Sequence, residues 1–366
     1  MTTHSMWLGI AILALWLVPT LPSLSDEPRI PTAWIELAVE RLCLLDEPLF
    51  GLAAQQVLPG AWLLDESFRE SNGIVTRVDQ RFVVSGGDEL RLIRLQNGGR
   101  LRRLTIEWFE LDHEGTRASL QAMTDDTCQL LAGRRIVNKA PGETLLEHLD
   151  SDLRTIRWTE TLEAPLPDGQ DPGGPRIALV DSGLAYDLPI YRNRLARNPD
   201  GKPLGYDFWD DDLFPYDADM SRGPFFPIRH GTSVASILLR DAPTAALIPF
   251  RYPRPQMMRM GEVVEHAAKA GASILAIPLG SRRSADWTTF ADAMRAHPEI
   301  LAIVSAGNDG ENIDQHPIWP AALDLDNMIT VTSSDGLGRL APQSNWGPKS
   351  VDIMLPAENV DYIDIL

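Results

Sequence analysis

Three short motifs in the second half of the sequence carry side chains that could do acid–base chemistry together. Asp181 begins an Asp-Ser-Gly motif that closes an apolar run, and His230 begins a His-Gly-Thr motif that opens a helical pattern. Asn308 follows another apolar run, within the turn Ser-Ala-Gly-Asn-Asp-Gly. A carboxylate, an imidazole and an amide are the groups that orient a general base, accept a proton and stabilise an oxyanion. Each motif alone also fits an ordinary turn, so the chemistry requires all three to meet at one site.

Of the seven histidines, only His230 stands at the predicted start of a helix, before small and apolar residues. The positive end of the helix dipole disfavours an imidazolium there, so we expect a neutral ring that is ready to accept a proton. We interpret His4 as part of an N-terminal signal and the remaining histidines as surface or packing residues, namely His113, His148, His266, His297 and His316.

The elements that must position these side chains alternate along the chain. Helical stretches such as residues 234–239 and 262–270 alternate with short, almost wholly apolar runs at residues 177–180, 246–250, 273–277 and 300–304. Such runs indicate a sheet covered on both faces, which is typical of a doubly wound, mostly parallel α/β domain. Asp181 then lies at the carboxyl end of a buried strand, the sheet edge at which catalytic groups gather.

From about residue 175 to 356 the sequence resembles the subtilisin-type serine proteases. The family's Asp and His motifs match residues 177–183 and 230–235, and its oxyanion-hole asparagine matches Asn308. Its substrate-groove strand matches residues 277–280, and residues 329–332 and 350–356 resemble the last strands before the nucleophile. The order Asp, then His, is also the order found in subtilisin.

This resemblance implies a role for each matched residue. Asp181 would orient and stabilise His230, His230 would take the proton of the nucleophilic serine, and Asn308 would hold the tetrahedral oxyanion. Leu279 and Gly280 would pair with or border the substrate, a polypeptide. The mechanism requires no cofactor.

Members of this family often bind calcium, and this chain has an acidic segment in which such a site could form. Its residues 207–219 hold six aspartates, of which Asp207, Asp210 and Asp212 could form a cation loop. A solvated acidic loop, or one that attracts basic substrates, is the alternative.

The chain also departs from the family pattern. Ser233 stands where a second histidine is usual, and Pro278 replaces a common serine of the groove strand, which removes a backbone donor. The family's Gly-Thr-Ser nucleophile motif does not follow residues 354–356. Ser233 lies in a Gly-Thr-Ser stretch, but it shares a helical turn with His230, and the base needs a nucleophile from another segment. The sequence therefore predicts a catalytic domain, residues 176–366, that is incomplete at its C-terminus and nearly inactive, with the serine beyond residue 366.

The N-terminal half predicts a smaller α+β domain over residues 26–163. A helix is expected over residues 31–45, a hairpin over residues 89–111 with its turn at 97–99, a helix near 143–149 and a strand at 156–162. Residues 164–175, rich in Pro, Gly and Asp, have no periodicity and predict a linker.

Composition limits the partners and the cellular compartment. The formal net charge of -18 argues against nucleic acid or an anionic membrane as a partner, and it leaves the oligomeric state open. Residues 6–18 are apolar and too few to span a bilayer, so residues 1–25 are interpreted as a signal peptide for export to the periplasm or beyond. An uncleaved signal anchor is the alternative. In an exported chain the only two cysteines, Cys43 and Cys128, could form a disulfide or remain two buried thiols.

Three hypotheses of function follow. The first is an exported subtilisin-like endopeptidase whose N-terminal domain is a cleavable prosegment or a retained accessory domain. The second is a catalytically dead homologue that binds peptides in the same groove. The third is an unrelated exported α/β ligand-binding protein, in which Asp181 and His230 would lie far apart. The first two predict a hydrogen bond between the carboxylate of Asp181 and Nδ1 of His230.

Overall fold

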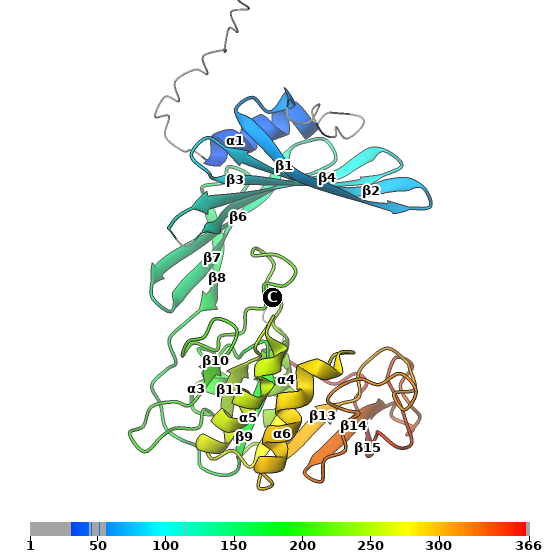
Figure 1. Ribbon diagram of the computed structural model, residues 1–366. Helices are drawn as coiled ribbons and strands as arrows, with labels where there is room; N and C mark the ends of the chain where they lie inside the picture. Colours follow the sequence, from blue (N-terminus) through cyan, green and yellow to red (C-terminus); the bar gives the residue numbers. More distant parts are fainter. Residues whose placement is uncertain (1–30, 44, 46–50, 52–55, 114, 364–366) are drawn as a thin grey trace, which may run out of the picture.

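The computed structural model describes residues 31–363, except 44, 46–50, 52–55 and 114. It contains an antiparallel sheet of eight strands, β1 to β8 in chain order, and a parallel sheet of seven strands in the order β10-β11-β9-β12-β13-β14-β15. Figure 1 shows β7 and β8 leading from the first sheet to the second. The expected signal peptide lies outside the described residues. Within them, no helix is both long and apolar enough to cross a membrane.

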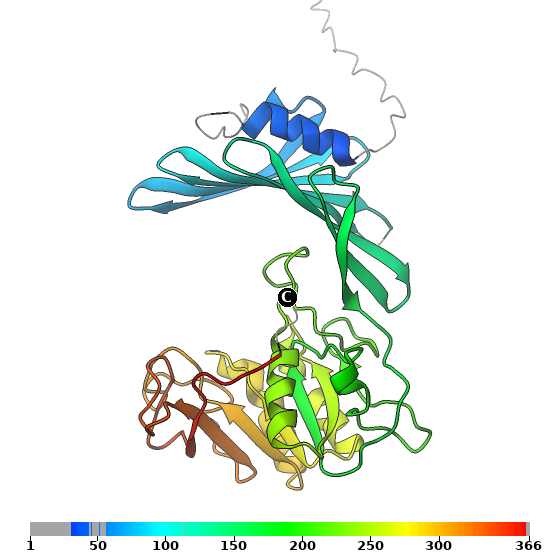
Figure 2. The same cartoon turned by 180° about the vertical axis from the view of Figure 1, so that it is seen from behind.

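The first sheet is a series of hairpins with one covered face. Its strands are β1 (Ala61–Ser71), β2 (Ile74–Val84), β3 (Glu89–Asn97), β4 (Arg100–Leu111), β5 (Thr116–Thr124), β6 (Leu130–Ala140), β7 (Glu143–Leu149) and β8 (Ile156–Glu163). Side chains alternate between the faces of a strand, and Leu90 and Leu92 of β3 are buried in one cluster with Ile35 and Ala38. The latter two belong to α1 (Pro31–Ala38), which lies on the face turned away from the second sheet (Figures 1 and 2).

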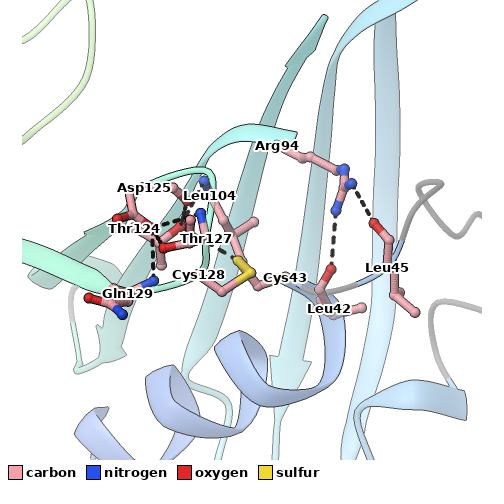
Figure 3. The surroundings of a disulfide bond; sticks show 10 residues. All are labelled: Leu42, Cys43, Leu45, Arg94, Leu104, Thr124, Asp125, Thr127, Cys128 and Gln129. Carbon is pink, nitrogen blue, oxygen red and sulfur yellow. Dashed lines mark hydrogen bonds between the residues drawn. A yellow bond between two sulfur atoms is a disulfide. The ribbon is translucent and has the colours of Figure 1, made fainter. Parts of the chain in front are cut away.

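A disulfide joins the helical segment to this sheet. Cys43 ends a π-helical turn (Val39–Cys43) that follows α1, and Cys128 lies between β5 and β6, with 5.7 Å between the two Cα atoms. Figure 3 shows Arg94 of β3 beside it, donating hydrogen bonds to the carbonyl oxygens of Leu42 and Leu45 at 3.1 and 2.6 Å. Of the two alternatives that the sequence left open for the cysteines, the structure therefore has the disulfide.

The second sheet has helices on both faces. Its strands are β9 (Arg176–Asp181), β10 (Tyr206–Asp207), β11 (Ala246–Arg251), β12 (Ile274–Ile277), β13 (Leu301–Ser305), β14 (Met328–Ser334) and β15 (Ile353–Pro356). Its helices are α3 (Pro189–Arg192), α4 (His230–Asp241), α5 (Met260–Lys269) and α6 (Thr288–Ala296), with 3-10 turns at Met257–Arg259 and Ser284–Trp287.

The alternation along β9 shows which helix covers which face. Ala178 and Val180 are buried in one cluster with side chains of α5 and α6, whereas Ile177 and Leu179 are buried with side chains of α4. Figure 1 shows α5 and α6 in front of the sheet, and Figure 2 shows α4 from behind. Burial on both faces explains why this strand is apolar from Ile177 to Val180 and does not alternate with polar residues.

Most of the expected elements are confirmed, including the hairpin β3–β4, the strand β8 and the parallel, helix-covered second sheet. The expected α+β character of the N-terminal region is not confirmed, because this region is mostly antiparallel sheet. The predicted helix at residues 143–149 is strand β7, which pairs with β6 and with β8. Leu146 and Leu149 have helical spacing, but periodicity over so short a run does not separate helix from strand, and pairing on both sides decides.

Candidate active site

The site centres on a carboxylate at the end of a strand and an imidazole at the start of a helix. Asp181 is the last residue of β9 and His230 is the first of α4. Nδ1 of His230 lies 2.8 Å from Oδ1 and 2.9 Å from Oδ2 of Asp181, so the predicted hydrogen bond is confirmed. The Asp181 side chain is 4% exposed and that of His230 is 56% exposed. The pair therefore has a buried acid and an accessible ring.

The residues after His230 let the helix approach the strand closely. A Cβ atom at Gly231 would lie 2.1 Å from the carbonyl oxygen of Gly183 and 3.0 Å from Cβ of Asp181, so only glycine fits. The hydroxyl of Thr232 accepts a hydrogen bond from the backbone N–H of Ala185 at 2.9 Å. The Gly-Thr dipeptide thus fixes the start of α4 against the turn that follows β9.

A second carboxylate, that of Asp217, is fully buried close to the Asp181–His230 pair. Its Oδ1 lies 2.7 Å from the hydroxyl of Ser182, and its Oδ2 accepts the backbone N–H of Thr232 at 2.7 Å. Ser182 also accepts the N–H of Gly231 at 2.8 Å, and its own N–H donates to Oδ1 of Asp181 at 2.6 Å. Both motifs are therefore joined to one buried acid.

The electrostatics of His230 differ from the expectation. The hydrogen bond that the ring donates to Asp181 raises the pKa of His230; partial burial opposes this, and the charges of Asp181, Asp217 and Asp219 add to it. The expectation that the imidazolium is disfavoured is therefore wrong, because the hydrogen bond to Asp181 and the nearby carboxylate charges favour it. Burial raises the pKa of Asp217 to about 6.

Asn308 lies three residues beyond β13, in an exposed turn. Its side chain makes no hydrogen bond to another described residue. Asn345, which is fully buried, holds this turn: its Oδ1 accepts the N–H groups of Asp309 and Glu311 at 2.9 Å each, and its Nδ2 donates to the carbonyl of Ala306 at 2.9 Å. The turn is thus rigid although the Asn308 amide is accessible.

The remaining predicted residues lie at the same edge of the sheet. Strand β12 pairs in parallel with β9 and β13, and Leu279 and Gly280 follow it after one intervening residue, Pro278. Leu279 is partly buried against the core, and Gly280 is exposed. Because parallel strands end at a common edge, residues after β9, β12 and β13 gather there. The structure joins Asp181 to His230 by direct contact and places the other three only at this shared edge.

The acidic segment, residues 207–219, is only partly solvated. Asp207, Asp217 and Asp219 are buried, whereas Asp210 and Asp211 are exposed. Asp207 is paired with Arg251 at 2.8 Å, and Asp219 accepts the hydroxyl of Tyr252 at 2.8 Å. Buried carboxylates require such donors, and the spacing of aspartates along the sequence does not reveal them.

The possible cation loop gains no support from this geometry. Asp210 is paired with the same arginine as Asp207, and Asp212 accepts the N–H of Phe214 at 2.7 Å. Among the described residues, no three acidic, histidine or cysteine side chains are grouped closely enough to hold a metal ion.

A cavity of about 740 Å³ lies away from the pair, between the first sheet and the acidic segment. Phe109, Ile136, Glu163, Phe214 and Tyr216 are among its lining residues, whereas Asp181 and His230 are not. Its size does not make it the site of chemistry, because the hydrogen-bonded acid and base lie elsewhere.

Sequence reasoning did not identify the supporting residues Asp217 and Asn345. Asp217 was visible only as one aspartate of an acidic cluster. Asn345 lies in a Ser-Asn-Trp turn without apolar periodicity or a motif partner, so no signal in the sequence identified it. Both act through partners that are distant in the sequence.

Comparison with models of protein families gives a match over the second half of the chain. Residues 173–365, more than half of the chain, match the model of the subtilase family, peptidase S8. The chain therefore belongs to the subtilase family of serine peptidases, and the unrelated ligand-binding protein is not favoured. A search of curated proteins finds no match.

Solved structures of subtilisin-like proteases are similar to part of the chain. A lanthipeptide protease has 22% identity and a TM-score of 0.41, covering 51% of this chain and 56% of its own. The epidermin leader peptide processing serine protease EpiP from Staphylococcus aureus has 18% sequence identity and a TM-score of 0.38. The match covers 52% of this chain and 53% of the EpiP chain. The protease domain of PatA has 21% sequence identity and a TM-score of 0.40. The match covers 53% of this chain and 70% of the PatA chain. This chain thus matches only about half the length of the lanthipeptide protease and of EpiP.

Replacing Asp181 by asparagine is expected to lower the pKa of His230 toward the ordinary value of 6.5, because the hydrogen bond to the carboxylate is the main cause of the raised pKa. A raised histidine pKa stabilises the fold below pH 6.5, and this contribution is lost as the pH rises through the folded-state pKa. Asp181→Asn should therefore destabilise more at pH 5.5 than at pH 9. Ring-proton NMR titration and urea unfolding measure both, with the exposed Asp241→Asn as control. An unchanged His230 pKa would contradict the assignment.

Replacing Gly307 by alanine is expected to disrupt the Asn308 turn. Gly307 has a φ of 97°, and a Cβ atom there would lie 2.6 Å from Nδ2 of Asn345, which its hydrogen bonds hold in place. We expect a loss of about 1–3 kcal/mol in the free energy of unfolding, measured by urea denaturation. Gly336→Ala, where a Cβ atom meets nothing within 4 Å, serves as control and should be neutral. Equal stability of the two variants would show that the turn tolerates a side chain.

Proposed function

We propose that this chain carries the acid, the base and the oxyanion donor of a subtilisin-type serine endopeptidase. The observation that carries the proposal is the hydrogen bond between Asp181 and Nδ1 of His230. In this mechanism the buried carboxylate holds the ring in the tautomer whose proton is on Nδ1, which leaves Nε2 as the acceptor. Nε2 then takes the proton of the attacking hydroxyl and later gives it to the leaving amine.

The accessibility of the ring supports this division of roles. More than half of the His230 side chain is exposed, whereas its partner acid is buried. Among the described residues, no side chain is hydrogen-bonded to Nε2. The raised pKa also makes the ring a stronger base.

The carboxyl edge of the sheet would receive the substrate. An extended polypeptide would lie beside Leu279 and Gly280, with its scissile carbonyl toward Asn308. A side-chain amide on a turn held by Asn345 suits an oxyanion donor, because a preorganised donor needs no reorganisation during the reaction.

We infer that none of the described serines is the nucleophile that His230 would activate. No serine among the described residues is hydrogen-bonded to His230. The hydroxyl of Ser233 donates instead to carbonyl oxygens, that of Arg229 at 3.3 Å or that of Ile363 at 3.1 Å. Figure 2 shows the C-terminal segment running to α4, where this contact forms.

We also propose export to the periplasm or the extracellular space. The disulfide between Cys43 and Cys128 supports this, since disulfides persist in oxidising compartments. The net charge of -18 supports a polypeptide partner over nucleic acid.

The nucleophile inference predicts that a fluorophosphonate probe will not label this protein. The probe reacts with a serine that a base has activated, and Ser233 shares a helical turn with the base. Mass spectrometry of the treated protein checks this, with Ser233→Ala as the matched variant and an active subtilisin-type protease as positive control. Labelling that disappears in Ser233→Ala would identify Ser233 as the nucleophile and overturn the inference.

The substrate class predicts that an extended peptide will bind at the carboxyl edge of the second sheet. In NMR titrations of the full chain, an unstructured peptide of about eight residues should shift the resonances of Gly280, Asn308 and the His230 ring, because a substrate strand spans several residues. The all-D peptide of the same sequence is the control and should bind more weakly. Shifts confined to other surfaces, or equal shifts with both peptides, would contradict the proposed function.

A further inference from the structure

We propose that the N-terminal sheet positions the Asp181–His230 pair, and that it does so through one residue, Arg229. The consequence for catalysis rests on the proposed function, but the positioning itself does not. On this proposal, the N-terminal sheet helps to set the geometry of the Asp181–His230 pair.

The two sheets meet in an apolar seam close to the site. Leu146 of β7 and Leu162 of β8 form one buried cluster with Ala218 and Phe225 of the segment that precedes α4. Arg134 of β6 adds a polar contact to the same segment, donating to the carbonyl of Phe225. The sheet is thus packed against the chain that leads to His230.

Arg229 is the residue immediately before His230, and its side chain is only 9% exposed. One of its terminal nitrogens donates to Oε2 of Glu160 at 2.9 Å and to the carbonyl of Thr161 at 2.7 Å, both on β8. The other donates to the backbone carbonyl of Asp217. A planar guanidinium with several donors suits such a fork better than an ammonium. Arg229 therefore connects β8, the segment before α4 and the start of α4.

The carboxylate of Glu160 is itself held in place by hydrogen bonds to both of its oxygens. Its second oxygen, Oε1, lies 2.6 Å from Nε2 of His148, whose ring stacks on Trp158 with 3.5 Å between the ring centroids. Burial would raise the pKa of Glu160, but hydrogen bonds from His148 and Arg229 outweigh it and lower that pKa. The carboxylate is thus ionised and held from two sides.

The connection continues from Arg229 to the pair through Asp217. The carbonyl of Asp217 accepts Arg229, while its carboxylate accepts Thr232 and Ser182. Ser182 in turn contacts Asp181 and Gly231. Loss of the Glu160 contact would therefore loosen both the segment that carries Asp217 and the first turn of α4.

The test measures the His230 ring directly and needs no nucleophile. Glu160→Asp keeps the negative charge but shortens the reach to Arg229, whereas Glu160→Gln keeps the reach and removes the charge. Positioning predicts that Glu160→Asp lowers the His230 pKa and increases the exchange rate of its Nδ1 proton by about tenfold, which corresponds to about 1.4 kcal/mol. NMR titration of the full chain gives both values.

Two controls separate positioning from other causes. Glu147→Gln removes a charge that is paired within the first sheet, with Arg135 at 2.5 Å, and it should leave the ring unchanged. Arg229→Lys keeps a charge but loses the fork, and it should act like Glu160→Asp. The charged groups that face the ring are Asp181, Asp217, Asp219 and the neighbouring Arg229, and these variants keep all of those charges.

A response in Glu160→Gln alone would show a distant charge effect and would overturn the positioning. An unchanged ring in all Glu160 and Arg229 variants, with native backbone spectra, would overturn it as well. Failure of the proposed function would show differently, as a lack of peptide binding at the carboxyl edge while the ring still responds to Glu160→Asp.

Discussion

The candidate site depends on the need of one fully buried carboxylate, that of Asp217, for hydrogen-bond donors. A buried charge without donors would cost several kcal/mol, so the chain must bring donors to it. The donors come from Ser182, after β9, and from Thr232, in the first turn of α4. Satisfying this one group therefore draws together the two segments that carry Asp181 and His230, although these lie 49 residues apart.

The acidic character of the region follows from the same requirement. The buried aspartates before α4 are hydrogen-bonded to an arginine, a tyrosine hydroxyl or a backbone N–H group. Their remaining field acts on the imidazole and helps to raise its pKa. The negative net charge of the protein thus has a local effect on the base in addition to any effect on solubility.

The sequence predicted the parts of the fold in which pattern and environment agree. The apolar runs of the second half predicted the strands because both faces of that sheet are buried, and the Asp and His motifs predicted contact because each ends or begins an element. Strand β7 could not be predicted, since its seven residues fit either period and only pairing with β6 and β8 decides. Asp217, Arg229 and Asn345 could not be assigned for a related reason. Their importance comes from donors and acceptors far away in the chain, which no local pattern encodes.

The connection between the two sheets, residues 164–175, contains no helix or strand, yet the folded protein holds it firmly. Arg197, only 3% exposed, donates to the carbonyl of Pro167 at 2.9 Å, and its N–H donates to Asp171 at 2.8 Å. The hydroxyl of Tyr186 binds the carbonyl of Ala164. Hydrolysis of a peptide bond within this connection would therefore yield a nicked, two-chain protein whose halves stay associated through the apolar seam and Arg229.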